Sequence, residues 1–189
     1  MTAAHGFDDD KRAGIFRALA QGMEIPEVLE RFHLSREELK ALFLEVAESY
    51  KARQSGYWHL FCDGASRGNP GPAGAGAVLL DPGGQPQGRA VRFLGKATNS
   101  IAEYQALLLG LEMALEKGVR RLQIFSDSQL LVEQLNGGYQ VRSPHLKPFW
   151  RQAMNLLQNF EAYAISHIDR TMNAEADRLA NQAIDRHSE

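Results

Sequence analysis

Four carboxylates in this 189-residue chain have the side-chain type and the placement to bind divalent cations. Asp63, Glu103, Asp127 and Asp177 each fall where the hydrophobic pattern predicts that a strand ends or a helix begins. Side chains at such positions can converge on one crevice, but clustered carboxylates repel one another unless a hard cation such as Mg²⁺ neutralises them. The four acids therefore indicate a metal-dependent nuclease.

The elements that must position these acids are three strands followed by alternating helices and strands. Short apolar or alternating runs, divided by turns rich in Gly and Pro, predict an antiparallel meander at 57–62, 74–80 and 89–94. Beyond it, helices are predicted at 101–117, at 128–135, after Pro148 and from Ala174, with strands at 122–126 and 162–168. Strand–helix–strand units of this kind are parallel with right-handed crossovers. The fold class is therefore α/β, a mixed sheet flanked by helices.

This topology would bring the four acids together. Asp63 is expected to end the first strand and Asp127 the fourth, and as parallel neighbours these two strands would direct both side chains into one crevice. Glu103 begins the helix that crosses over between them, and Asp177 lies one turn into the last helix. The spacing permits a single site without proving it.

Residues 1–55 have only helical periodicity and predict a small all-α unit before the catalytic unit at 56–189. Ser35 with Glu38 forms a capping-box pattern at the start of a third helix, and Lys51–Gly56 is predicted to be a linker. The segment 24–44 resembles a helix-turn-helix, which would bind DNA through the helix from Arg36. A helical bundle for protein contact or self-association is favoured, because acidic side chains outnumber basic ones on that helix.

Composition limits the remaining classes. The net charge is −2, with 8 Lys and Arg against 10 Asp and Glu in residues 1–55 and 13 against 13 in residues 56–189, so a general basic coat for nucleic acid is excluded. No apolar run is long enough for a membrane helix, and the N-terminus has acidic residues at 8–10 instead of a leader pattern. We expect a cytoplasmic monomer without membrane contact. Cys62 is the single cysteine, so no intramolecular disulfide can form.

Four local motifs, in this order over residues 57–187, resemble type 1 ribonuclease H. They are FCDGASRGNPG at 61–71, TNSIAEY at 98–104, SDSQ at 126–129 and NAEAD at 173–177. The resemblance implies a five-stranded ribonuclease H-like mixed sheet and an endonuclease that cuts the RNA strand of an RNA·DNA hybrid with two Mg²⁺ or Mn²⁺ ions. Such an enzyme leaves 5′-phosphate and 3′-hydroxyl ends.

The resemblance also implies residue roles. The four acids would be both the catalytic residues and the metal ligands, with Asp63 bridging the two ions. Groups that donate and accept hydrogen bonds are needed to recognise the 2′-hydroxyls that distinguish RNA from DNA. The family's substrate contacts would fall on Gly64, Ser66, Asn69, Thr98, Asn99, Ser100, Gln129 and Asn173.

The chain departs from the family in two places. Many members have a loop histidine before the last acid, whereas residues 169–173 contain none, and His167 is predicted to be mainly a structural strand residue. Some members insert a basic protrusion that grips the hybrid, whereas 138–147 is a short loop. That loop, together with Phe149 and Trp150, is a candidate for secondary substrate contact. Alternatively, these two aromatic residues form the apolar face of the next helix.

Other interpretations remain for the acids and for the whole chain. Glu103 could be the capping-box partner of Ser100, Asp127 a helix cap and Asp177 a solvated helix residue. The chain could be a non-catalytic binding module that recruits a protein partner through residues 1–55. A weaker hypothesis is an actin-like ATPase, from the pattern Asp-Gly-x-x-x-Gly at 63–68, but one short domain disfavours it.

Overall fold

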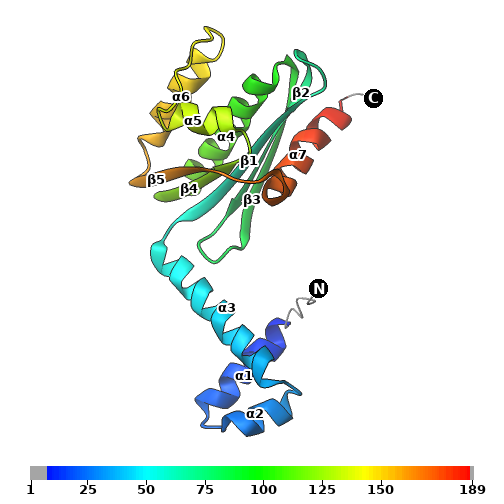
Figure 1. Cartoon of the computed structure of the whole chain (residues 1–189), viewed down its shortest axis with the longest axis vertical. Coiled ribbons are helices and arrows are strands. Elements are labelled where there is room, and N and C mark those ends of the chain that lie inside the picture. The colour runs from blue at the N-terminus through cyan, green and yellow to red at the C-terminus, as the bar shows by residue number, and fades with distance from the viewer. Residues whose placement is uncertain (1–7, 188–189) are drawn as a thin grey trace. The chain divides into compact units, whose positions relative to one another are not determined.

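The chain forms two compact units, Met1–Tyr50 and Lys51–Glu189, shown in the computed structural model of Figure 1. The structure describes residues 8–187 and, within them, every side chain except those of residue 9 and residues 48–55. No helix in this described part is long and apolar enough to cross a membrane.

The N-terminal unit consists of three helices, α1 Asp9–Ala20, α2 Ile25–Arg31 and α3 Arg36–Ser55. The predicted capping box is present, because the Ser35 backbone N–H donates to the Glu38 carboxylate at 2.8 Å and the Glu38 N–H donates to Ser35 Oγ at 3.1 Å. The three helices bury a small apolar core of their own that includes Ile15, Val28 and Leu42.

The segment predicted as a linker, Lys51–Gly56, is helical and not a loop, because α3 continues to Ser55. The sequence from Lys51 to Gln54 contains good helix formers, and nothing in it stops a helix that is already running. Gly56 has a φ of 65°, the left-handed conformation that commonly follows a helix end. The polar composition of this segment was mistaken for a loop signal.

The second unit is built on a five-stranded mixed sheet of order β3-β2-β1-β4-β5, which confirms the predicted fold class. The strands are β1 Trp58–Ser66, β2 Gly71–Leu80, β3 Pro86–Ala97, β4 Arg121–Ser126 and β5 Ala162–His167. The first three strands pair antiparallel, whereas β4 runs parallel to both β1 and β5. Neighbouring parallel strands at the centre of the sheet create the point at which ligands bind in open α/β folds.

Helices cover both faces of this sheet (Figure 1). They are α4 Asn99–Glu116, α5 Gln129–Leu135, α6 Lys147–Leu157 and α7 Ala174–Asp185. The main core lies between the sheet and α4, α5 and α6. On the other face, a Cβ at Gly74 would lie 2.3 Å from the Ala180 carbonyl oxygen, and one at Gly76 would lie 2.5 Å from that of Ala176. These glycines let α7 pack directly on β2.

Asp63 does not end its strand as predicted. β1 continues past it to Ser66, and Asp63 pairs with Gly76 of β2. The parallel pairing with β4, however, stops at Phe61 opposite Phe125. β1 is therefore held by β2 on one side while it separates from β4 on the other. This separation opens the sheet beside Asp63.

Candidate active site

The four predicted carboxylates line one cavity of about 410 Å³, at the point where β1 and β4 separate. Asp63 comes from β1, Glu103 from the second turn of α4, Asp127 from the residue directly after β4, and Asp177 from the first turn of α7. Two strands and two helices, spread over more than half of the sequence, therefore place their acids in the same crevice.

Burial and mutual repulsion make this cluster unfavourable in the absence of a counter-charge. Asp63 is 5% exposed and Glu103 is 7% exposed. Burial, then the charges of Asp127 and Asp177, raise the pKa of Asp63 from 3.8 to about 7. Burial and the charges of Asp63 and Asp127 also raise the pKa of Glu103 well above its usual value. The two buried acids favour the protonated form, because the charge of Arg170 only partly offsets burial and repulsion at Asp63.

Three of the acids, Asp127, Glu103 and Asp177, each accept a hydrogen bond from a neighbouring group. Asn173 Nδ2 donates to Asp127 Oδ1 at 2.7 Å and to the Cys62 carbonyl oxygen at 3.0 Å. Glu103 accepts from the Gly64 backbone N–H at 3.3 Å and from Asn99 Nδ2 at 3.4 Å. These contacts fix carboxylates at separate positions around the cavity, rather than drawing them into one tight group.

Arg170 provides the remaining donor and was not predicted as a site residue. Its guanidinium donates to Asp177 Oδ1 at 2.7 Å, and its side chain is 77% exposed. Arg170 lines the cavity from a short 3₁₀ helix, η1 Arg170–Asn173, which precedes α7. The only signal in the sequence was a basic residue in the segment that lacks the family's histidine.

The donor set suits a hard divalent cation. All four acids offer carboxylate oxygens, the ligands that Mg²⁺ and Mn²⁺ prefer, and a cation would relieve the repulsion that raises the pKa of Asp63. Within the part of the chain that the structure describes, no three His, Cys, Asp or Glu side chains already form a closed group of metal ligands. The acids therefore fit a cation chemically, although Oδ1 of Asp177 is already paired with Arg170.

The predicted substrate-contact residues divide into two groups. Gly64, Ser66 and Asn99 line the cavity beside the acids, and Asn69 Oδ1 accepts from the Asn99 backbone N–H at 3.4 Å. Thr98 caps α4 by accepting from the Ile101 N–H at 3.3 Å.

The second group lies off the cavity or below its surface. Ser100 and Gln129 are absent from the cavity lining, and Gln129 is exposed on α5. Asn173 is 1% exposed, so it lies beneath the cavity surface and orients Asp127 through its hydrogen bond. Ser128 and Asn181 line the cavity without having been predicted. Asn181 stands four residues after Asp177 on α7, a spacing that places both on one helix face.

The simpler interpretations of the acids do not hold. Thr98, not Ser100, caps α4, and Glu103 points to Gly64 of β1 rather than to the helix start. Ser128 caps α5 through the Leu131 N–H at 3.4 Å, which leaves the Asp127 carboxylate free for the cavity. Asp177 is paired with Arg170 inside the cavity. None of these acids is explained by local helix geometry.

His167 ends β5 with an exposed side chain, and its Nε2 lies 3.2 Å from the Asp127 carbonyl oxygen. The ring therefore contacts the backbone that carries Asp127. It does not line the cavity.

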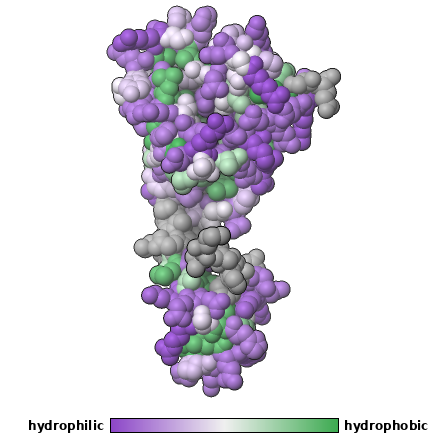
Figure 2. Space-filling model, turned by 45° about the vertical axis from the view of Figure 1, so that its right-hand side comes forward, coloured by the Kyte–Doolittle hydropathy of each residue, from purple (hydrophilic) through white to green (hydrophobic). Residues whose placement is uncertain are grey.

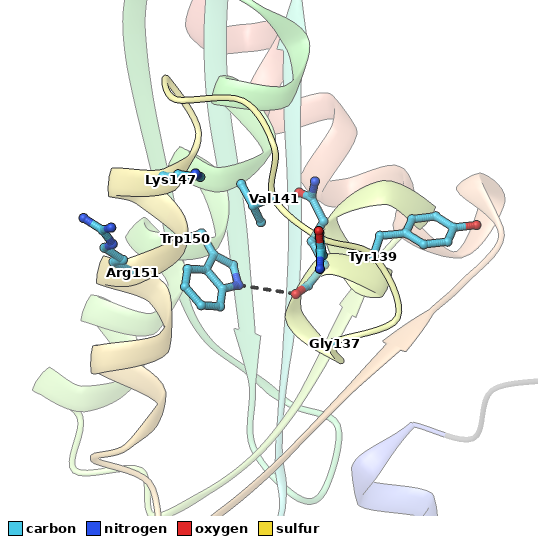
Figure 3. Close-up of a pocket in the computed structure, with 8 residues that line it drawn as sticks. Gly137, Tyr139, Val141, Lys147, Trp150 and Arg151 are labelled. Carbon is cyan, nitrogen blue, oxygen red and sulfur yellow. Dashed lines mark hydrogen bonds between the residues drawn. The ribbon is translucent and has the colours of Figure 1, made fainter.

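A second cavity of about 370 Å³ lies between the end of α5, the 137–141 loop and α6 (Figure 3). Trp150 Nε1 donates to the Gln134 carbonyl oxygen at 3.3 Å, which joins α6 to α5. Phe149 and Trp150 both pack against the main core, so the interpretation as an apolar helix face is confirmed for both. The cations on this cavity are Lys147 and Arg151, one helical turn apart.

Comparisons with known proteins match the second unit. A family model described as reverse transcriptase-like matches residues 61–183. Ribonuclease HI of Halobacterium salinarum is 41% identical over 132 residues, which are 70% of this chain and 66% of that protein. A bifunctional protein of Mycobacterium tuberculosis is 40% identical over 124 residues, which are 65% of this chain and 34% of that protein. The chain thus matches only part of the length of these two relatives.

Solved structures agree with these matches. The crystal structure of RNase H1 from Halobacterium salinarum superposes with a TM-score of 0.67 at 41% identity, covering 69% of this chain and 98% of that one. LC11-RNase H1, solved in complex with an RNA/DNA hybrid, superposes with a TM-score of 0.67 at 34% identity, covering 70% of this chain and 99% of that one. The matched family region begins at residue 61, after the N-terminal unit.

Proposed function

This chain belongs to the reverse transcriptase-like family and, within it, to the ribonuclease H1 proteins, and we propose that it hydrolyses the RNA strand of RNA·DNA hybrids. The observation that supports this activity best is the single cavity lined by Asp63, Glu103, Asp127 and Asp177. A protein that only binds nucleic acid has no use for a buried cluster of like charges, because the cluster costs stability and repels phosphate.

The four acids would hold two divalent cations, Mg²⁺ or Mn²⁺. Bound there, the cations supply Lewis-acid activation of water and stabilise the charge that develops at the scissile phosphodiester, leaving 5′-phosphate and 3′-hydroxyl ends. Asp63 is buried and its pKa is raised by the charges of both Asp127 and Asp177, which supports a role in holding both ions. Asn173 would keep Asp127 oriented toward them, because the amide nitrogen that donates to Asp127 also donates to the Cys62 carbonyl oxygen.

The rim of the cavity would recognise the RNA strand. Ser66, Asn99 and the Gly64 backbone line the same space as the acids, and hydroxyl and amide groups can both donate to and accept from a 2′-hydroxyl. Asn69 supports Asn99 through the contact to its backbone N–H. A DNA strand lacks this hydroxyl, so it would form none of these contacts.

The second strand of the hybrid would lie along the surface formed by Tyr139, Lys147 and Arg151. Cations can position a phosphate backbone, and an exposed aromatic ring can pack on a sugar or base. Because a short loop replaces the basic protrusion, only a few cations would contact the hybrid at this surface. We therefore expect hybrid binding that weakens steeply as salt is added.

A cleavage assay on the full chain tests the proposal. End-labelled RNA·DNA, RNA·RNA and DNA·DNA duplexes are incubated with Mg²⁺, with Mn²⁺ or with EDTA, using wild type, Asp127→Asn and the surface control Glu112→Gln. We expect cleavage of the hybrid's RNA strand by wild type and the control, and none with EDTA or Asp127→Asn. If Asp127→Asn cleaves like wild type, the assigned site is wrong. Absence of metal binding in calorimetry would instead favour a non-catalytic binding module.

A further inference from the structure

The N-terminal unit has a groove that its own core does not fill. Ile25 of α2 and one face of α3 line a cavity of about 470 Å³. The α3 residues recur at steps of three and four: Arg36, Leu39, Lys40, Phe43, Leu44 and Ala47. Leu44 is 57% exposed, Ile25 46% and Phe43 41%. Figure 2 shows hydrophobic surface on this unit. We call this surface the α3 groove.

Exposed apolar side chains gathered in one groove indicate an interaction site, since single exposed residues are common but clusters are not. The neighbouring Leu42 is completely buried, so the helix already has a separate inward face. Leu39 belongs to that core, whereas Ile25, Phe43 and Leu44 are exposed in the groove. The α3 lining from Arg36 to Ala47 is about three helical turns long, roughly 16 Å at the rise of an α-helix.

The charge on the groove is opposite to that of the unit as a whole. Its lining has two cations, Arg36 and Lys40, and no acid. Two nearby acids are engaged elsewhere: Glu38 closes the capping box with Ser35, and Glu45 pairs with Arg12 at 2.9 Å. Both cations lie toward the N-terminal end of α3, and the remaining lining is apolar.

We propose that the α3 groove docks a short amphipathic segment of a partner protein, with apolar anchors at one end and carboxylates at the other. The apolar anchors pack on Phe43, Leu44 and Ile25, and the carboxylates pair with Arg36 and Lys40. Helix-in-groove recognition uses anchors at this same three- and four-residue spacing. The cations set the direction in which the segment lies.

Two other occupants fit the groove less well. Reading of base edges in DNA requires donors and acceptors, and Phe43, Leu44 and Ile25 provide neither. In a symmetric contact between two copies, each groove would meet the same surface of its partner. That surface contains the same two cations and no counter-charge. An acidic partner of different sequence satisfies both the apolar stripe and the cations.

A peptide selection on the full chain tests this proposal. A random 12-residue library displayed on phage is selected on immobilised wild type, with counter-selection on Leu44→Ser. Enriched peptides are then synthesised and titrated against wild type, Leu44→Ser, Arg36→Glu and Val91→Ser by fluorescence anisotropy. Val91 is 39% exposed on the second unit and serves as a matched control. Hybrid cleavage and thermal unfolding of each variant are measured in parallel.

We expect enriched peptides with Asp or Glu near one end and apolar residues at three- and four-residue spacing. Leu44→Ser should weaken their binding about tenfold or more, as loss of a central anchor does. Arg36→Glu should weaken it similarly, and a peptide with Lys in place of its acids should bind Arg36→Glu better than wild type. Val91→Ser should bind like wild type, and cleavage should be unchanged in all groove variants.

Three results would overturn the proposal. One is a selection in which no peptide binds wild type better than it binds Leu44→Ser, or in which only basic peptides are enriched. Another is duplex DNA binding that Leu44→Ser abolishes. The third is a concentration-dependent dimer of wild type that becomes monomeric in Leu44→Ser. Because peptide binding is read without catalysis, a failure of the proposed nuclease activity leaves this test intact.

Discussion

The cavity lined by the four acids and the α3 groove are both candidate binding sites, but they are built in different ways. In the cavity, four elements distant in sequence hold like charges, two of them buried, and the partner we propose is a small cation. In the groove, two helices adjacent in sequence expose apolar side chains, and the missing partner is a macromolecule.

The difference shows how each kind of site is maintained. The cavity depends on the whole second unit, since moving β1, β4, α4 or α7 displaces an acid. The groove depends on a short stripe along one helix and can change without disturbing the core beneath it. Substitutions in the cavity should therefore change both stability and activity, whereas substitutions of exposed groove residues should change neither.

Asp63→Asn should separate activity from stability most clearly. We expect hybrid cleavage to fall by about 1,000-fold, on the order of the loss when a group that stabilises transition-state charge is removed. The metal-free protein should become more stable by about 1 kcal/mol at pH 8, because a buried charge is removed from the cluster. Initial cleavage rates and chemical denaturation with EDTA measure the two effects. Equal stability of variant and wild type would show that the acids are not strained.

Gly64→Ala should damage the cavity through packing alone. An added Cβ would lie 2.1 Å from the Ala102 carbonyl carbon and from the Glu103 nitrogen, so α4 must move away from β1. We expect a loss of about 3 kcal/mol, as for overpacking, together with reduced cleavage. The control is Gly22→Ala in the N-terminal unit, where nothing lies within 4 Å of the new atom. Its positive φ costs about 1 kcal/mol, and cleavage should be retained.

Leu42 and Leu44 should differ sharply although they stand two residues apart on α3. Leu42 is fully buried, so Leu42→Ala should cost the N-terminal unit about 2–3 kcal/mol. Leu44→Ala removes a largely exposed side chain and should change stability by no more than about 0.5 kcal/mol. Thermal unfolding followed by circular dichroism compares the two. A large cost for Leu44→Ala would mean that the groove belongs to the unit's core.

The metal-free protein should lose stability as pH rises, and Mg²⁺ should restore it. The folded chain holds a proton on Asp63 that the unfolded chain releases, because its pKa is raised from 3.8 to about 7. The contribution of Asp63 to stability is therefore complete below pH 3.8 and is lost as pH rises through about 7. At pH 8, Mg²⁺ at ten times its Kd should add about 1.4 kcal/mol.

Denaturation curves of wild type and Asp63→Asn from pH 4 to pH 8 isolate this contribution, since the variant lacks the titrating group. Identical pH dependence in the two proteins would contradict the assignment to Asp63. The groove variant Leu44→Ala should follow the wild-type curve throughout.

The sequence predicted the order and type of most elements because its hydrophobic periods are strong. The two errors, a linker at Lys51–Gly56 and the early end of β1, have a common cause. A helix supplies its own hydrogen bonds and continues through polar helix formers, as α3 does, whereas a strand continues while a neighbour pairs with it, as β2 does with β1 beyond Asp63. Polar or charged residues at such positions look like boundaries in the sequence, although the backbone continues.

Arg170 illustrates what the motifs could not predict. It contributes no recognisable pattern, and its role follows from η1 turning it toward Asp177. The α3 groove is similar, since three- and four-residue spacing is the same for a stripe that is buried and for one that is exposed. Which stripe of α3 faces the core depends on how α1 and α2 pack against it.

The sequence alone determined the family and fold class of the second unit, because four motifs in the right order identify it, and it predicted that four acids form a hard-cation site. It also predicted the helices that the structure describes between Asp9 and Ser55. Only the tertiary structure decided that β1 separates from β4 beside Asp63, that Asn173 and Arg170 hold two of the acids, and that α3 exposes a second apolar face. The physical reason is that side-chain chemistry is local, whereas burial and charge proximity depend on which distant segments pack together.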